Sequence, residues 1–160
     1  MTKKCVLETD GYQVSFDLKE TQVSKKYADM VVDLVLDQHL GSVAAKSVPT
    51  LIAVRDLYRL MEYFEAHIAQ LLWDPDRESS TFVPMELGFQ VQALAGEVQA
   101  ENAGEFSLRF FVNVGRSEAD GHRVYVGGEA VVTLTHLRRF VTSLQETLAD
   151  LSCADGVRRA

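Results

Sequence analysis

The sequence predicts an α+β fold of two similar β-β-β-α units, with two amphipathic helices covering an antiparallel sheet or sheets. Several segments alternate apolar and polar residues, as half-buried strands do, and two longer segments space apolar residues by three and four, as helices do. Strands and then a helix follow in the same order twice along the chain. Because one helix and a few strands bury little surface alone, we expect residues 1–160 to form a single compact domain.

An internal repeat is the strongest feature of the chain. The segment Gly11-Tyr12-Gln13-Val14 recurs in the second half as Gly88-Phe89-Gln90-Val91, and the apolar positions of the two predicted helices align in the same order. We therefore predict a pseudo-repeat of residues 5–73 and 82–152, joined by a hinge at about 74–80. Convergence of the two halves on a common strand-strand-helix order is the alternative explanation.

The first half contains two clear strands and a helix. Residues 12–18 and 30–36 alternate with period two and are predicted strands. A weaker strand is predicted over 43–48, where Pro49 ends it because proline cannot donate a ladder hydrogen bond. Residues 55–72 form the first predicted helix, which has no side-chain oxygen before it to cap its start.

The second half repeats this plan with longer strands. Met85, Leu87 and Phe89 alternate along the first of them, and residues 95–104 are predicted to hold a hairpin turn. Gly127-Gly128 predicts a bulge or bend in the last strand. The predicted strands cover 85–93, 106–114 and 124–134, and the closing helix covers 136–151, with Thr135 as its N-cap and a frayed polar tail from Asp150 to Ala160.

Composition and charge exclude several classes of protein. The chain has 160 residues, of which 47% are hydrophobic and 24% charged, as in ordinary globular domains. Its formal net charge of -7 opposes binding to nucleic-acid phosphates and to anionic lipid. No apolar run is long enough to span a membrane, and Glu8 and Asp10 interrupt any signal peptide. We therefore expect a cytoplasmic protein without nucleic-acid or membrane partners. In that compartment Cys5 and Cys153 should stay reduced, and a disulfide bridge between the two chain ends is the alternative.

The sequence carries no catalytic or ligand-binding motif. Neither the nucleophile elbow G-x-S-x-G nor the phosphate loop G-x-x-x-x-G-K-[ST] is present. The four histidines, His39, His67, His122 and His136, lack the i, i+4 pairing of a helical zinc site. We therefore expect no enzymatic activity, no cofactor and no metal, and we expect His67 to flank the core.

Asp29, Asp33 and Asp37 form the most distinctive polar group. They lie opposite the apolar residues of the predicted strand over 30–36. Carboxylates four residues apart in a strand are separated by about 13 Å, too far to share a cation or to act as a glycosidase pair. Two interpretations stay open: a solvated face that keeps the sheet soluble, and a docking surface for a basic protein partner.

Three aromatic residues, Tyr58, Tyr63 and Trp73, are candidate interface anchors, because aromatic side chains concentrate in binding hot spots. Tyr58 falls off the main apolar stripe of its helix, and Trp73 follows the end of that helix. We predict that Trp73 packs at the edge of the core against the linker between the halves. Phe111 points away from Phe110 in its strand, so it belongs either to a second core layer or to an exposed patch.

The stretch 27–37, the turn Gly41-Ser42-Val43 and the group Asp56-Leu57-Tyr58-Arg59-Leu60 follow one another in an order that resembles the WapI-type immunity proteins. Those small bacterial proteins protect a cell from contact-delivered toxins of its own kind. The resemblance implies a long strand with a polar outer face, a glycine-containing return strand and a helix that opens near a D-L-x-x-L group. It carries over no binding residue, because immunity families vary widely on their surfaces.

Together these observations predict a non-enzymatic, acidic binding protein of the bacterial cytoplasm. Its most concrete form is an immunity protein that neutralises a toxin by protein–protein contact, with a basic toxin domain as the partner. Asp29, Asp33 and Asp37 are the predicted partner-binding residues. An oligomeric structural or adaptor module is the alternative, and the sequence is compatible with a homo-oligomer.

Overall fold

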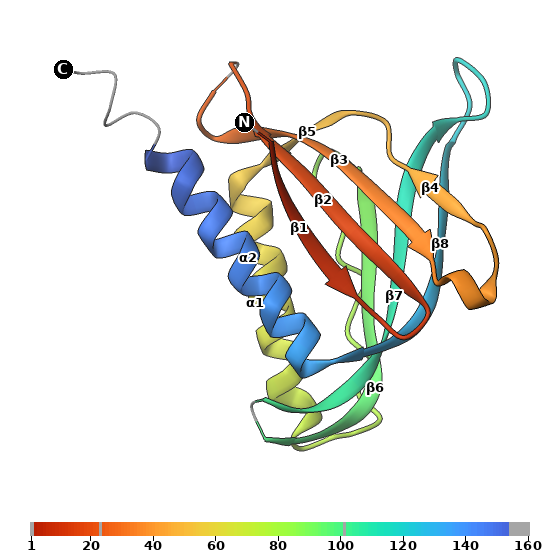
Figure 1. The fold of residues 1–160 in the computed structure, drawn as a ribbon, viewed down its shortest axis with the longest axis vertical. Coiled ribbons are helices and arrows are strands. Elements are labelled where there is room, and N and C mark those ends of the chain that lie inside the picture. The colour runs from red at the N-terminus through yellow and green to blue at the C-terminus, as the bar shows by residue number, and fades with distance from the viewer. Residues whose placement is uncertain (1, 23, 101, 154–160) are drawn as a thin grey trace.

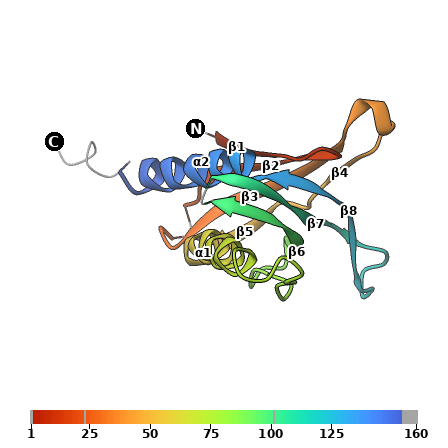
Figure 2. The same cartoon turned by 90° about the horizontal axis from the view of Figure 1, so that it is seen from below.

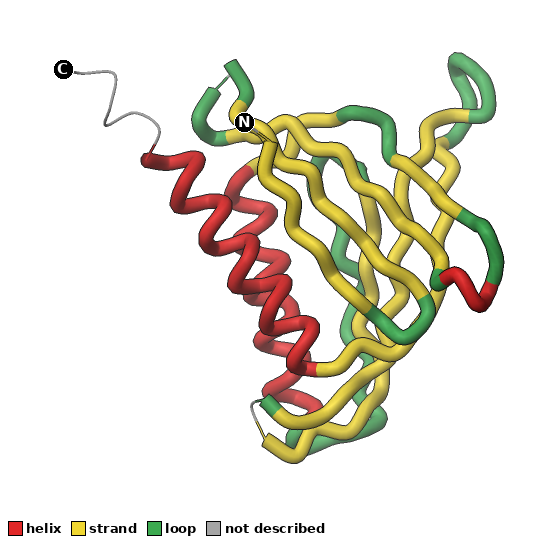
Figure 3. Tube along the Cα trace, viewed as in Figure 1, coloured by secondary structure: helices red, strands yellow, loops and turns green. Residues whose placement is uncertain are grey.

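Two groups of strands, each followed by a helix, make up the chain. The computed structural model describes residues 2–22, 24–100 and 102–153, without the side chain of Cys153. Loops at the ends of the strands are short except for the long connection that follows the first helix (Figure 3). The elements are β1 (Thr2–Glu8), β2 (Tyr12–Glu20), β3 (Tyr27–Leu36), the 3-10 helix η1 (Gln38–Leu40), β4 (Ala44–Lys46), β5 (Thr50–Ala53), α1 (Val54–Leu71), β6 (Phe89–Ala100), β7 (Ala103–Arg116), β8 (Arg123–Thr133) and α2 (Leu134–Cys153).

The first sheet is antiparallel and is built around β3. Its strand order is β1-β2-β3-β4, and β5 also pairs with β3. β4 pairs with residues 33–35 of β3, whereas β5 pairs with residues 27–30. The alternation along β2 buries Val14, Phe16 and Leu18 on the inner face, while Ser15 and Asp17 belong to the outer face, where neighbouring side chains cover Ser15. One face of this sheet therefore belongs to the core, and the other faces outward.

The second sheet, with the order β6-β7-β8, packs against the inner face of the first (Figures 1 and 2). Phe16 of β2 marks the centre of the core. The centroid of its ring lies 5.0 Å from that of Phe89, 5.4 Å from that of Phe140 and 5.9 Å from that of Phe110. Residues of both sheets and of α2 thus share one hydrophobic core.

Both helices lie on the same side of the molecule, where they close the core beside the sheets (Figures 1 and 2). α1 packs against β6 and β5, and α2 packs mainly along β1. Phe64 of α1 and Leu144 of α2 are buried, as their central places on the two apolar stripes predict.

The α+β class is confirmed, with two antiparallel sheets and two helices. α1 matches the predicted helix 55–72 to within a residue, and no side chain caps its start, as expected. A hairpin turn within residues 95–104 joins β6 to β7, also as predicted. β1 and β5 are not among the predicted strands, because β1 has few apolar alternations and β5 is only four residues long.

Residues 85–88 are not part of a strand, so the prediction of a strand from Met85 is wrong. Leu87 has a φ of 60°, in the left-handed region, and its carbonyl oxygen accepts hydrogen bonds from Asn113 Nδ2 and from the Tyr125 hydroxyl. The Met85 N–H donates to Asp56 Oδ2 at 3.0 Å. These bonds to residues far away in the sequence stabilise a turn where the local alternation favoured a strand.

Gly127-Gly128 forms no bulge, contrary to the prediction. β8 pairs with β7 without a shift at these glycines, and the register shift lies between Asn113 and Gly115 of β7. Gly115 has a φ of 116°, which a residue with a side chain rarely adopts. The irregularity thus falls on the opposite strand β7, at Gly115.

α2 begins two residues earlier than predicted, and its cap is a different threonine. Thr133 Oγ1 accepts a hydrogen bond from the backbone N–H of His136 at 3.2 Å, so Thr133 and not Thr135 acts as the N-cap. The helix also continues beyond Asp150 to Cys153. The remainder of the predicted polar tail, residues 154–160, lies outside the described residues.

Candidate functional site

The outer face of the first sheet gathers the charged residues of β1, β2, β3 and β4. These side chains point outward because they alternate with the buried apolar residues of the same strands. The strand register decides which of them become neighbours. Lys4 lies opposite Asp17, Lys19 lies opposite Asp29, and Asp33 lies between Ser15 and Lys46.

Asp29 and Asp33 lie on this outer face, as the alternation predicted. Asp29 is exposed, and its cross-strand neighbour on β2 is Lys19. The Asp33 side chain is only 24% exposed, and its Oδ1 lies 3.9 Å from Lys46 Nζ. Each carboxylate is therefore matched by a lysine on a neighbouring strand, and the face carries mixed rather than single-sign charge.

Asp37 lies beyond the end of β3 and has a local role. Its side chain caps η1 by accepting a hydrogen bond from the His39 backbone N–H, and Oδ1 lies 2.5 Å from His39 Nδ1. The hydrogen bond from the His39 side chain lowers the pKa of Asp37 below its ordinary value. The structure thus does not bring Asp37 together with Asp29 and Asp33 into one continuous stripe.

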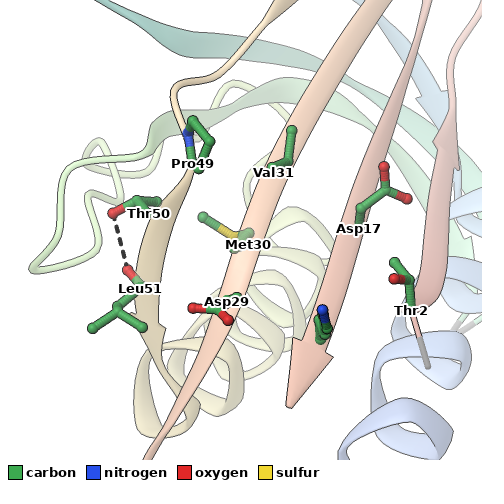
Figure 4. Close-up of a pocket in the computed structure, with 9 residues that line it drawn as sticks. Thr2, Asp17, Asp29, Met30, Val31, Pro49, Thr50 and Leu51 are labelled. Atoms are coloured by element: carbon green, nitrogen blue, oxygen red, sulfur yellow. Dashed lines mark hydrogen bonds between the residues drawn. The ribbon is translucent and has the colours of Figure 1, made fainter. Parts of the chain in front are cut away.

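A shallow groove of about 440 Å³ crosses this face where the chain passes from β4 to β5 (Figure 4). The Ser47 N–H donates to the Val32 carbonyl, and the Val32 N–H donates to Ser47 Oγ, so the chain stays attached to β3 as far as Ser47. The Val48 N–H then donates to the Asn113 carbonyl of β7. Proline has no N–H for the ladder, and the pairing resumes only with β5. The groove is lined by Thr2, Asp17, Lys19, Asp29, Met30, Val31, Pro49, Thr50 and Leu51.

The lining of the groove suits recognition of a side chain. Val31, Pro49 and Leu51 provide apolar surface, and all three are at least partly exposed. Asp29 and Lys19 provide charges of opposite sign at its border. An apolar side chain placed there would lose contact with water, while the two charges would orient its polar neighbours.

His67 is buried in the core rather than at its flank. Its Nε2 lies 2.8 Å from the Leu94 carbonyl oxygen, and its Nδ1 lies 2.8 Å from Ser79 Oγ. A carbonyl only accepts, so Nε2 carries the proton and Nδ1 accepts from the serine hydroxyl. Burial lowers the pKa of His67, which keeps the ring neutral. The ring has no exposed surface, and its two hydrogen bonds tie α1 to the loop before β6, through Ser79, and to β6 itself, through Leu94.

Sequence reasoning missed this role, although His67 follows Phe64 by three residues on the buried stripe of α1. Among the described residues, no group of three or more His, Cys, Asp and Glu side chains is placed to hold a metal ion. Cys5 is buried and free, with Sγ 3.3 Å from Thr147 Oγ1. The expectation for Cys153 lies outside the described side chains.

The aromatic residues lie in different surroundings. Tyr63 is partly buried on α1, where its hydroxyl donates to the Ser80 carbonyl and accepts from the Ala93 N–H. Trp73 is 90% exposed, so the prediction that it packs at the edge of the core is wrong. Trp73 lies just after the end of α1 and two residues before Pro75, and its indole faces solvent. Tyr58 is exposed on α1, and Phe111 is partly buried on the outer face of the second sheet, beside Gly127.

No helix in the described part of the chain is long and apolar enough to cross a membrane. No family model matches the chain, and no curated protein matches it either. The resemblance to WapI-type immunity proteins therefore stays a hypothesis that depends on the order of sequence features alone.

Proposed function

We propose that this chain is a non-enzymatic protein-binding module whose docking surface is the groove on the outer face of the first sheet. One observation carries the proposal: apolar surface of Val31, Pro49 and Leu51 lies open beside the oppositely charged Asp29 and Lys19. Neither helix lies in front of these strands (Figure 1). Protein interfaces combine an apolar centre with a polar rim in this way.

The most concrete form of this function is toxin neutralisation, as in the immunity proteins that the sequence resembles. The net charge of -7 favours a basic toxin domain as the partner, because opposite net charges speed association. Asp29 and Asp33 would act at the border of the contact, where charges set orientation and association rate. Asp37 would contribute only if the contact extended to η1.

The genes that flank the source gene provide the test of this form. Each neighbour is expressed alone and together with this chain, and growth is measured. We expect one neighbour to stop growth alone and to be tolerated when the chain is present. If no neighbour is toxic, or if the chain rescues none, the immunity function is wrong.

The groove itself is tested with Asp29→Lys, using Glu118→Lys as the matched control. Both residues are exposed and both changes alter the net charge equally, but Glu118 lies in the loop between β7 and β8. We expect Asp29→Lys to slow association with the partner several-fold and to change its salt dependence. Equal effects of the two variants would show that the overall charge acts, and not the groove.

We also propose that the two halves share a duplicated plan. The order of elements supports it: β2 and β3 correspond to β6 and β7, and the last strand of each half, β5 or β8, runs directly into its helix without an intervening loop. Residues 11–72 should superpose on residues 88–151 with each helix in the same relation to its strands. Different helix placements in the two halves would favour convergence instead.

A further inference from the structure

The outer edge of β8 is open between Arg123 and Glu129. Within the described part of the chain, β8 pairs with β7, and its other edge bonds to another segment at Val131. The Val131 N–H donates to Asp10 Oδ1, and its carbonyl accepts from the Asp10 N–H. The other sheet edges are covered or short, which hinders pairing with another chain. β1 lies against α2, the loop before β6 bonds to β6, and β4 and β5 have only three and four residues.

Only alternate residues of β8 direct their backbone N–H and carbonyl groups toward the open edge. Both backbone groups of Val131 point away from β7, toward Asp10. Because this direction alternates along an antiparallel strand, Glu129, Gly127, Tyr125 and Arg123 also direct their N–H and carbonyl groups outward. A second strand can pair with this edge only if its own outward residues lie opposite these.

The open segment is self-complementary about Val126. If two copies lie antiparallel with Val126 opposite Val126, outward residues face outward residues, and Tyr125 lies opposite Gly127. The same register sets Arg123 of each copy opposite Glu129 of the other. A shift of two residues in either direction keeps the backbone phase but loses both charge pairs.

The charges of Arg123 and Glu129 also complement the polar side chains on the outer face of the second sheet. Arg109 Nε lies 2.7 Å from Glu129 Oε2, and Arg109 Nη1 lies 3.3 Å from Gln92 Oε1. These residues form a polar row across β6, β7 and β8. Arg123 from a second copy would extend the row on the far side of Glu129.

Apolar side chains surround the open edge. Val124 and Val126 are 40% and 37% exposed, and the segment 124–128 contains neither lysine nor proline to block pairing. Leu40 is 53% exposed, and a Cβ built on Gly11 would lie 3.9 Å from Leu40 Cδ1 and 3.0 Å from the Cβ of Ala130 in β8. Pairing of two edges would cover part of this apolar surface.

We infer that the chain forms a two-fold homodimer in which the β8 strands pair antiparallel and join the two second sheets into one continuous sheet of six strands. Val126 lies at the two-fold axis, and Arg123 and Glu129 form the reciprocal ion pairs. This inference is independent of the proposed function, because the groove lies on the other sheet.

Sedimentation equilibrium of the full chain over a range of concentrations tests the dimer. We expect a species of twice the chain mass of 17.8 kDa. Arg123→Glu should weaken dimerisation at least tenfold, because it places two carboxylates opposite each other, and adding Glu129→Lys should restore it. Arg116→Glu is the matched control, since Arg116 lies opposite Arg123 on β7 and away from the edge.

Cysteine pairing tests the register. In a Cys153→Ser background, Val126→Cys should form an intermolecular disulfide, because non-hydrogen-bonded antiparallel pairs place Cα atoms about 4.5 Å apart, within disulfide range. Val124→Cys should not, because its copies would lie about 13 Å apart along the strands. Circular dichroism checks that each variant folds.

Four results would overturn the inference. They are a monomer at every concentration, equal dimerisation of Arg123→Glu and Arg116→Glu, failure of Glu129→Lys to restore pairing, and equal crosslinking at the two cysteine positions. A chain that stays monomeric but takes up an extended peptide at β8 would also refute the homodimer, since the edge would then serve a different partner.

Discussion

Gly127 and Gly128 are neighbours in β8, yet a methyl group should have opposite effects at the two positions. A Cβ built on Gly127 would lie 1.8 Å from the Phe110 carbonyl oxygen, on the backbone of the central strand β7. A Cβ on Gly128 would meet no atom within 4 Å. Gly127→Ala is therefore the perturbation, and Gly128→Ala is its matched control.

The cost of Gly127→Ala follows from the overlap. Real Cβ atoms essentially never approach closer than 3.0 Å, so β8 must move away from β7 by roughly the difference. Such a displacement weakens about two ladder hydrogen bonds, at about 1 kcal/mol each, and leaves about 1–3 kcal/mol of strain. We expect a loss of about 3–5 kcal/mol for Gly127→Ala, and for Gly128→Ala a change of less than about 1 kcal/mol, with stabilisation favoured because alanine restricts the unfolded chain.

Urea unfolding followed by circular dichroism measures both values. The experiment is repeated at several protein concentrations, because a dimer would add a concentration-dependent contribution to stability. A common slope of free energy against urea would show that the variants share the native fold. If the two variants differ by less than about 1 kcal/mol, the close approach of β8 to Phe110 at Gly127 is wrong.

Three further predictions test the core, a helix cap and a buried histidine. Phe64→Ala should cost about 3–5 kcal/mol and Leu144→Ala about 2–5 kcal/mol in urea unfolding, and losses below about 1 kcal/mol at both sites would refute their burial in the core. Thr133→Ala should cost about 1 kcal/mol by removing the N-cap of α2, whereas Thr135→Ala should change stability by less than about 0.5 kcal/mol, and the reverse order would refute the assigned cap. Because burial lowers the pKa of His67, the unfolded state binds more protons, so stability should be full above the ordinary histidine pKa of about 6.5 and fall as the pH drops below it. His67→Gln should show a smaller loss of stability between neutral and acidic pH, and an unchanged pH profile would show that the ring is not kept neutral.

Local periodicity accounts for the parts of the fold that the sequence predicted well. Apolar residues recur every second position in β2 and β3 and every third or fourth position in α1, and these spacings are properties of single segments. The outward position of Asp29 and Asp33 follows from the same alternation. None of these features requires knowledge of which strands become neighbours.

The groove could not be predicted, because it depends on register. Pro49 predicted the end of a strand. It did not reveal that the chain would pair again with the other end of β3 as β5, or that apolar surface would stay open between β4 and β5. Nor does the spacing along β3 reveal that Lys19 lies opposite Asp29 or Lys46 opposite Asp33. These pairings turn a predicted acidic stripe into a face of mixed charge.

The sequence by itself determined the α+β class, the two helices and the inward and outward faces of the main strands, since chain geometry and apolar spacing act within one segment. Only the tertiary structure decided the division of the strands into two sheets, the turn at Leu87 and the burial of His67. The partners that stabilise the last two come from elsewhere in the chain: Asn113 and Tyr125 bond to Leu87, while Ser79 and Leu94 bond to His67. Such bonds form only after distant segments have packed together, and no local pattern encodes which distant groups will meet.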